Sequence, residues 1–340
     1  MTGPELQMKL RGQENTIMQY AKRNSMASRP ATPVAVGRVT IIAMMAAMAF
    51  SAVLCFAQQG GEKTFASPGD AVLDLYNAAK SMDTHEADAI FGSSAGDILH
   101  TGDKVADENM RTEFVKRYDQ MHRVVLEPDG SVTLYVGADN WPFPVSIVKS
   151  GNGNWYFDTE SGRKEILYRR IGRNENDAIE ILNSLVDAQR DYMAESHDGD
   201  KTKQYAAKFI SSEGKQNGLY WKTTDNDQPS PIGPLFVSAV GEGYNMQQGK
   251  PEPYHGYYYR ILTKQGAAAK GGARDYMVNG KLTKGFAFVA YPAEYRNSGV
   301  VTFIVNQDGV VYEKDLGADT AKIAGAMTEY NPDSSWSPSD

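Results

Sequence analysis

Two segments of the second half of the chain carry its densest group of side chains that could do chemistry. They combine phenol, imidazole, carboxylate and guanidinium groups, contributed by Tyr254, His255, Tyr257, Tyr291, Glu294, Tyr295 and Arg296. Tyrosine offers rigid apolar area with a polar tip, so such a cluster suits a carbohydrate, peptide or protein surface. The alternative interpretation is a tyrosine-rich, half-buried sheet that binds nothing.

The same segments also allow a hydrolytic interpretation. His255, Glu294 and Asp275 are then the acid and base groups of a hydrolase that cleaves an envelope polymer. Such a site needs a concave pocket with two carboxylates within about 10 Å of each other. The sequence contains no phosphate-binding loop or dinucleotide fingerprint. We therefore expect a protein that is not an enzyme, and keep the hydrolase as the alternative.

Three arginines, Arg169, Arg170 and Arg173, lie just before a helix that the pattern predicts to begin at Asn174. Backbone N–H groups at a helix start and guanidinium groups can together hold a phosphate or carboxylate. Salt bridges between two domains are the alternative role for these arginines.

A short acidic loop, His197-Asp198-Gly199-Asp200, follows the same predicted helix. Asp198 and Asp200 are two residues apart and can both turn toward Ca²⁺, although calcium loops use more oxygen ligands. The alternative is a turn that ends the helix. We expect no other cofactor.

The N-terminal residues 1–57 have the pattern of a secretory signal peptide. Arg38 precedes the uncharged run Val39–Ala57, which ends in a small residue, and cleavage is predicted after Ala57. An uncleaved membrane anchor formed by residues 39–57 is the alternative. The protein is therefore expected in the periplasm or the medium. If it contacts the membrane at all, we expect it to do so only through this segment.

Charge and cysteine content narrow the possible partners. Residues 58–340 carry 29 basic and 40 acidic side chains, and a body that acidic is a poor partner for nucleic acid. The single cysteine, Cys55, lies in the predicted signal peptide. A mature chain without thiols excludes cysteine nucleophiles, redox pairs and thiolate metal sites.

Hydrophobic periodicity predicts an α+β fold in two domains. Residues 58–165 combine helices near Pro68, Thr84–Phe91 and Asp107–His122 with an antiparallel meander, an order of elements that is similar to nuclear transport factor 2-like domains. Residues 166–340 combine a long helix with several strands, which fall between residues 254 and 316 and show alternating side chains. The Asn306–Gly309 segment predicts a tight hairpin turn. We expect the tail 331–340 to be frayed.

Several short motifs resemble those of the bacterial domain-of-unknown-function 2950 (DUF2950) family. They are Trp141-Pro142-Phe143-Pro144, Trp155-Tyr156-Phe157-Asp158, Arg169-Arg170-Ile171-Gly172-Arg173-Asn174-Glu175, Asp187-Ala188-Gln189-Arg190, Gly256-Tyr257-Tyr258, Ala290-Tyr291-Pro292 and Asn306-Gln307-Asp308-Gly309-Val310. The resemblance covers nearly all of residues 64–336. It implies an exported bacterial envelope protein and no particular activity.

The C-terminal half also resembles the globular part of type IV pilins and pseudopilins, with a long helix followed by a meander. A pilin helix begins as a membrane-spanning segment, whereas this predicted helix is internal and amphipathic, so the resemblance implies fold and not function. Our first hypothesis is a non-catalytic binding or envelope-assembly module whose partner is an envelope protein or polymer. A hydrolase and an accessory of a secretion or pilus system remain the alternatives.

Overall fold

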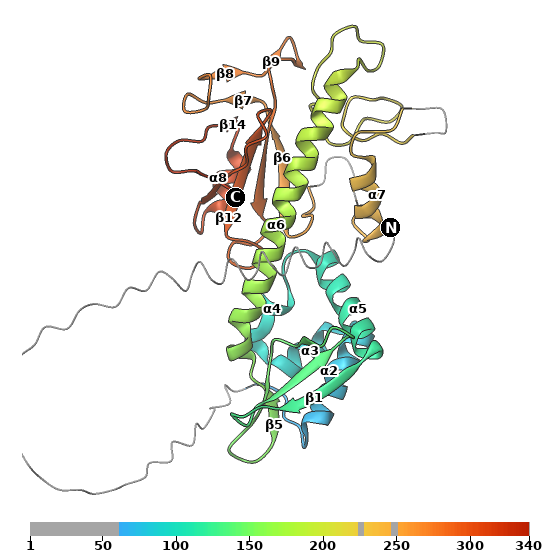
Figure 1. Ribbon diagram of the computed structural model, residues 1–340, viewed down its shortest axis with the longest axis vertical. Coiled ribbons are helices and arrows are strands. Elements are labelled where there is room, and N and C mark those ends of the chain that lie inside the picture. The colour runs from blue at the N-terminus through green and yellow to red at the C-terminus, as the bar shows by residue number, and fades with distance from the viewer. Residues whose placement is uncertain (1–60, 224–227, 246–250, 340) are drawn as a thin grey trace, which may run out of the picture. The chain divides into compact units, whose positions relative to one another are not determined.

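The computed structural model describes residues 61–223, 228–245 and 251–339 (Figure 1). The predicted signal peptide lies outside these residues. Helices and antiparallel sheets are combined in this part of the chain, which confirms the α+β class.

The first part of the chain packs helices on one antiparallel sheet. The helices are α2 (Pro68–Ser81), α3 (Thr84–Phe91), the 3₁₀ turn η1 (Ser93–Ala95), α4 (Gly96–Leu99) and α5 (Lys104–Gln120). Ser67 caps α2 by accepting a hydrogen bond from the Asp70 amide, as the Ser67-Pro68 signal predicts.

The strands of this first sheet follow in sequence and pair as a meander. They are β1 (His122–Leu126), β2 (Val132–Val136), β3 (Trp141–Pro142), β4 (Ile147–Lys149) and β5 (Trp155–Phe157), in the order β1-β2-β4-β5 with β3 beside β2. Leu134, Ile147 and Phe157 are fully buried between the sheet and the helices. The order is that of an antiparallel meander with β3 as an additional strand beside β2.

The long helix α6 (Thr159–Ala194) has 36 residues, and the predicted start at Asn174 is wrong. Asp158 caps the helix by accepting a hydrogen bond from the Ser161 amide. The apolar stripe of the helix is continuous only in its second half, and its earlier turns are rich in charged residues. Periodicity alone therefore placed the start too late. The helix runs without a break through residues 165 and 166, where we predicted a domain boundary.

The second sheet has five strands in the order β15-β13-β12-β11-β6. Their bounds are β6 (Tyr257–Leu262), β11 (Ala287–Pro292), β12 (Val301–Asn306), β13 (Tyr312–Asp315) and β15 (Ser337–Pro338). The turn between β12 and β13 is closed by a hydrogen bond from the Gly309 amide to the Asn306 carbonyl, with Gly309 at φ 79°, as expected for this hairpin.

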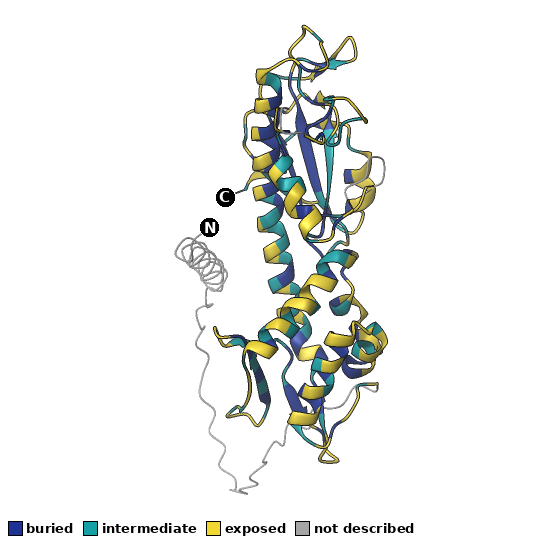
Figure 2. Ribbon diagram, turned by 90° about the vertical axis from the view of Figure 1, so that its right-hand side faces the viewer, coloured by how far each residue is buried: buried dark blue, intermediate teal, exposed yellow. Residues whose placement is uncertain are grey.

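Both faces of the second sheet are covered, and most of its central residues are buried (Figure 2). Phe288, Ala290 and Phe303 belong to the cluster that packs against α6. Val289 and Ile304 point to the other face, where they meet Ala324 of α8 (Thr320–Ala326). Successive residues of these strands point to opposite faces of the sheet, so their large side chains contribute to two separate hydrophobic cores.

Short elements complete the second half: α7 (Gly233–Gly241), β7 (Lys264–Gln265), β8 (Arg274–Asp275), β9 (Met277–Val278), β10 (Lys281–Leu282) and β14 (Glu329–Tyr330). The C-terminal tail is not frayed as predicted, because β15 pairs with β13 and the Lys314 ammonium lies 5.8 Å from the centre of the Trp336 ring. Within the described residues, no helix has the length and apolar character needed to cross a bilayer.

Candidate functional site

The strongest group of interacting ionisable side chains is built around His255. Its Nδ1 lies 2.9 Å from Asp177 Oδ2, and its Nε2 lies 2.7 Å from Glu242 Oε2. Asp177 comes from α6, Glu242 caps the end of α7, and His255 lies in the turn before β6. We call Asp177, Glu242, His255, Tyr244 and Tyr254 the His255 cluster.

The turn that presents the imidazole was predicted as strand. The predicted strand from Tyr254 begins only at Tyr257, because His255 and Gly256 both adopt positive φ, at 51° and 75°. A side chain at Gly256 would collide with Asn174, so glycine is required there for space as well as for conformation. The Gly256 amide donates a hydrogen bond of 3.0 Å to Asp103, which fixes the turn.

Asp103 joins this turn to the first part of the chain. It is 1% exposed, and its Oδ1 caps α5 by accepting from the Ala106 amide. Its Oδ2 accepts from the Tyr244 hydroxyl at 2.9 Å and from the Gly256 amide. One buried carboxylate therefore accepts hydrogen bonds from α5, from Tyr244 and from the turn that carries His255.

The electrostatics of the cluster favour a charged imidazole. Burial disfavours the imidazolium, but hydrogen bonds and charge attraction from Asp177 and Glu242 outweigh it and raise the pKa of His255 to about 8. At neutral pH His255 is therefore mostly protonated, and both of its nitrogens donate. Burial, followed by the charge of Asp103, raises the pKa of Tyr244, and burial and the Glu242 charge raise that of Tyr254.

The structure does not gather the predicted tyrosine-rich surface into one group, although the rings of Tyr254 and His255 are in contact. Tyr257 is fully buried under α6, and its hydroxyl donates to the Val301 carbonyl. Tyr291 belongs to the cluster on the opposite face of the sheet, where its ring lies 5.5 Å from that of Tyr258. Alternate residues of a strand point to opposite faces, so the sequence cluster is divided by the sheet.

The other predicted members have partners of their own. Glu294 accepts a hydrogen bond of 2.7 Å from Asn297, and the Tyr295 hydroxyl donates to Asp315. The Arg296 guanidinium lies 5.4 Å from the centre of the Tyr295 ring. Asp275, the remaining acid or base candidate, is exposed on β8 and accepts from the Met277 amide.

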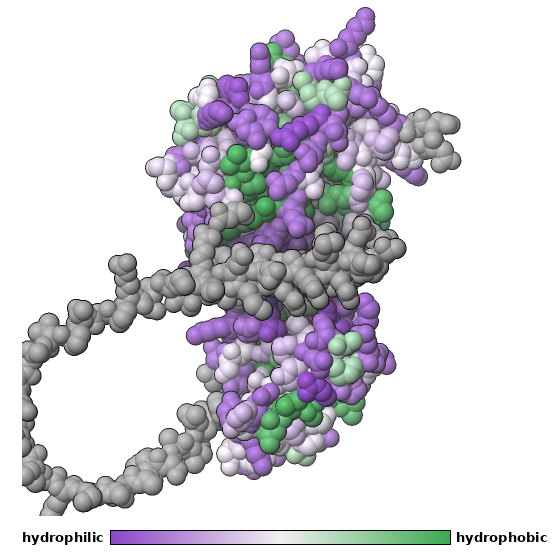
Figure 3. Space-filling model, viewed as in Figure 1, coloured by the Kyte–Doolittle hydropathy of each residue, from purple (hydrophilic) through white to green (hydrophobic). Residues whose placement is uncertain are grey.

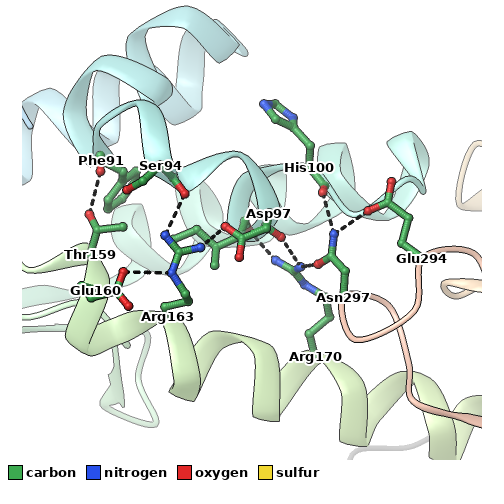
Figure 4. Close-up of polar contacts among 11 residues, drawn as sticks. Phe91, Ser94, Asp97, His100, Thr159, Glu160, Arg163, Arg170, Glu294 and Asn297 are labelled. Carbon is green, nitrogen blue, oxygen red and sulfur yellow. Dashed lines mark hydrogen bonds and ion pairs between the residues drawn. The ribbon is translucent and has the colours of Figure 1, made fainter. Parts of the chain in front are cut away.

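The three arginines lie in the middle of α6 and not at a helix start, so the helix-start part of the predicted anion site is wrong. Arg170 is 2% exposed and donates to the carbonyls of Asp97 and Ile98 and to the side chain of Asn297 (Figure 4). Asn297 in turn donates to the His100 carbonyl at 3.0 Å. Arg170 thus connects α4 to the segment after β11 through hydrogen bonds, and salt bridging between two domains stays a prediction.

The flanking arginines differ from Arg170. Arg169 pairs with Glu165 at 2.6 Å and stacks on the Trp141 ring, which holds it against the first sheet. Arg173 lies on α6, one turn before Asp177; burial lowers the pKa of its guanidinium, and the charge of Asp177 offsets only part of this. Arg163, ten residues before Arg173 on the same helix, pairs with Asp97 and Glu160 and donates to the Ser94 carbonyl (Figure 4).

The predicted calcium ligands form separate contacts. Asp198 accepts from the Gln216 amide at 2.9 Å. Asp200 pairs with Lys281 at 2.5 Å and accepts from the Thr202 amide, and these hydrogen bonds lower its pKa. The described ranges hold no group of three or more histidine, cysteine, aspartate or glutamate side chains arranged to bind a metal. Calcium binding at Asp198 and Asp200 stays a prediction.

A cavity of about 440 Å³ lies near the turn after β12 and includes Lys270, Asp308, Tyr312 and Tyr330 in its wall. None of the predicted site residues lines it. Sequence reasoning missed Asp103, Asp177, Glu242 and Tyr244, because no local motif marks them and only the fold brings them to His255.

A family model described as a protein of unknown function (DUF2950) matches residues 62–338. The chain belongs to the DUF2950 family. This membership confirms the resemblance carried by the sequence motifs, and the match includes the whole of the His255 cluster. No curated protein and no solved structure matches the chain, so the pilin-like and nuclear transport factor 2-like resemblances stay predictions.

Proposed function

We propose that this DUF2950 protein is an exported, non-catalytic module that binds another protein of the cell envelope. The observation that carries the proposal is the state of His255, which is held as a cation between Asp177 and Glu242. A general base needs a free lone pair at the working pH, and this imidazole has both nitrogens engaged. The arrangement supports a fixed, charged recognition surface.

An apolar ridge beside this cluster supports a protein as the partner. Val237 and Val240, three residues apart on α7, are 68% and 50% exposed. Glu242 lies two residues after Val240, so the ridge ends beside the His255 cluster in sequence. Apolar side chains bordered by charged groups are typical of protein–protein contacts.

Export is the second part of the proposal. The basic flank at Arg38 and the uncharged run that follows it support cleavage after Ala57. Expression of the full chain in a bacterial host, fractionation, and measurement of the intact mass test this directly. We expect a periplasmic or secreted species that begins at Gln58, and an uncleaved protein in the cytosolic fraction would contradict export.

The binding part is tested by capture from envelope extract with the mature chain as bait, followed by titration of each captured protein in purified form. The double variant Val237→Ser/Val240→Ser should weaken such binding at least tenfold, because two apolar contacts are removed. Ile323→Ser is the matched control, since Ile323 is 44% exposed on α8, away from the His255 cluster. Equal binding by all three proteins would contradict the α7 surface.

The hydrolase alternative predicts a different outcome. Incubation of the mature chain with peptidoglycan, envelope polysaccharide and denatured envelope protein would then release fragments, and His255→Asn would abolish the release. We expect no turnover that depends on His255. Turnover that is lost in His255→Asn but kept in Ile323→Ser would overturn the non-catalytic proposal.

A further inference from the structure

The first strand of the first sheet has one unoccupied edge within the described residues. β1 pairs with β2 and with no other described strand (Figure 1). The edge carries no proline inside the strand, and its five residues, His122-Arg123-Val124-Val125-Leu126, are rich in β-branched side chains. Natural proteins usually protect such an edge, because its free backbone groups can accept another strand.

The hydrogen bonds that flank β1 show which backbone groups are free. The Glu127 amide donates to the Ser131 carbonyl, and the Gly137 amide donates to the Met121 carbonyl. Hydrogen-bonded pairs alternate along an antiparallel ladder, so the odd-numbered residues of β1 direct their amides and carbonyls at β2. The amides and carbonyls of the even-numbered residues 122, 124 and 126 therefore point away from β2.

The side chains of this edge are also unusually exposed. Val124 lies opposite Leu134 and Leu126 lies opposite Val132 in the β1–β2 pair. Leu134 and Val132 are buried under the helices at 0% and 5% exposure, whereas Val124 and Leu126 are 46% and 68% exposed. β1 thus extends beyond the helical cover, and hydrophobic side chains gather over it in the lower part of Figure 3.

We propose that this edge binds the same edge of a second copy of the chain, in antiparallel register with Val125 opposite Val125. In that register Val124 of each copy pairs with Leu126 of the other, and these residues supply the free backbone groups that form the hydrogen bonds. The two sheets become one continuous sheet. Val124 and Leu126 of both copies then meet on the helix-covered face of the joined sheet.

Charge selects this register over its neighbours. Arg123 and Glu127 lie on the outer face, two residues either side of Val125, so each Arg123 faces the Glu127 of the second copy. A shift of the centre to Val124 would place Arg123 opposite Val125 and leave both charges unpaired. The geometry therefore points to one self-complementary arrangement with two ion pairs related by the twofold axis.

Both charges are available for this contact. The Arg123 guanidinium lies 4.4 Å from the centre of the Tyr135 ring, and its Nε donates to Asn140, which fixes the side chain on the outer face. Its Nη groups and the Glu127 carboxylate have no hydrogen-bond partner among the described residues. Two short strands bury less surface area than a stable dimer needs. We therefore expect a weak dimer, with a dissociation constant of tens of micromolar.

Charge reversal tests the register. In sedimentation equilibrium of the mature chain, Arg123→Glu and Glu127→Arg should each raise the dimer dissociation constant about tenfold or more, because each creates two like-charge pairs. The double variant Arg123→Glu/Glu127→Arg should recover the wild-type constant. An equimolar mixture of the two single variants should form heterodimers, since every facing pair is then opposite in charge.

Cross-linking tests the centre of the contact. The mature chain contains no native cysteine if cleavage follows Ala57, so Cys55→Ser in the full-length gene removes the only thiol in either case. Val125→Cys then places two thiols in a non-hydrogen-bonded pair with Cα atoms about 4.5 Å apart, a spacing that permits a disulfide. We expect rapid oxidation to a covalent dimer, and at least tenfold slower dimerisation for the control Leu126→Cys.

Proline variants separate loss of pairing from loss of fold. Val124→Pro removes an amide that points away from β2, so the mature protein should keep its melting temperature within a few degrees and become monomeric. A monomer at several hundred micromolar wild-type protein would overturn the proposal. So would a dimer that is unaffected by either charge reversal or by Val124→Pro. The contact is independent of the α7 surface, so neither result bears on Val237 and Val240.

Discussion

The two sheets of this chain are covered to different extents, and the difference separates stability from contact. The second sheet has α6 on one face and α8 with β14 on the other, and the residues at its centre are completely buried. The first sheet is covered on one face by helices and leaves β1 exposed. We infer that the second sheet holds the fold together, while the first offers an edge to a partner.

Polar contacts keep the two sheets from acting as separate bodies. α6 packs against β11 and β12 of the second sheet and against α4 of the first part. Arg170 and Asp103 add buried hydrogen bonds between segments on either side of the predicted boundary at residue 165. The two predicted domains are therefore expected to unfold together.

The largest effect is expected at the centre of the second sheet. Phe288 is fully buried between β11 and the α6 cluster, and Phe288→Ala should cost about 3–5 kcal/mol of unfolding free energy. Urea unfolding followed by circular dichroism measures the change. Val310→Ala, at 43% exposure in the hairpin turn, is the control and should change little. A loss below 1 kcal/mol for Phe288→Ala would mean that this core is loosely packed.

The next effect concerns the connection between the sheets. Arg170→Met should cost about 2–4 kcal/mol, because the carbonyls of Asp97 and Ile98 and the Asn297 amide group lose a buried donor. Arg169→Met is the matched control on the same helix, and its half-exposed pair with Glu165 should be worth about 1 kcal/mol or less.

The shape of the same unfolding curve carries a second test. If the hydrogen bonds of Arg170 alone couple the two sheets, Arg170→Met should split the single urea transition into two. If the buried Asp103 and the packing of α6 also couple them, one transition at lower urea should remain. We expect the single transition.

Local sequence signals predict much of this fold. Alternation at Phe288, Phe303 and Val305 correctly indicates buried strands, Asn306–Gly309 indicates their turn, and Ser67-Pro68 indicates the start of α2. Each of these depends on neighbouring residues only. Hydrophobic periodicity likewise gives the α+β class without any knowledge of packing.

Features that depend on distant partners were not predicted. The early turns of α6 lack a continuous apolar stripe, and they are stabilised by contacts such as Arg170 with Ile98, which is 72 residues away in sequence. His255 was found as a candidate, but its partner Asp177 is 78 residues away and lies on a different element. The tyrosines were grouped by sequence, although strand alternation sends Tyr257 and Tyr291 to opposite faces of the sheet.

A smaller effect on the unfolding free energy is expected from a change of pH, and it arises from His255 in the second half of the chain. The pKa of His255 in the folded protein, about 8, exceeds its unfolded value near 6.5. The stabilisation from this imidazolium is therefore complete below pH 6.5 and is lost as the pH rises through 8. We expect about 1–2 kcal/mol less unfolding free energy at pH 9 than at pH 6 from this residue.

The variant His255→Gln isolates that contribution. The groups that face His255 are Asp177, Glu242, Tyr244 and Tyr254, with Arg173 beside Asp177. The raised pKa values of both tyrosines keep them neutral at pH 9. The difference between wild type and His255→Gln should therefore shrink with rising pH, and a difference independent of pH would show that folding leaves the pKa of His255 unchanged.

The smallest effect is expected on the exposed edge of the first sheet. Leu126→Ser should change the unfolding free energy of the monomer by less than about 0.5 kcal/mol, because Leu126 is 68% exposed and loses few contacts. Leu134→Ala, on the neighbouring strand and fully buried, should cost about 2–5 kcal/mol in the same sheet. Urea unfolding at low micromolar protein keeps association out of the measurement. If Leu126→Ser destabilised the monomer as much as Leu134→Ala does, β1 would be part of the packed core, and its hydrophobic side chains would no longer call for a partner.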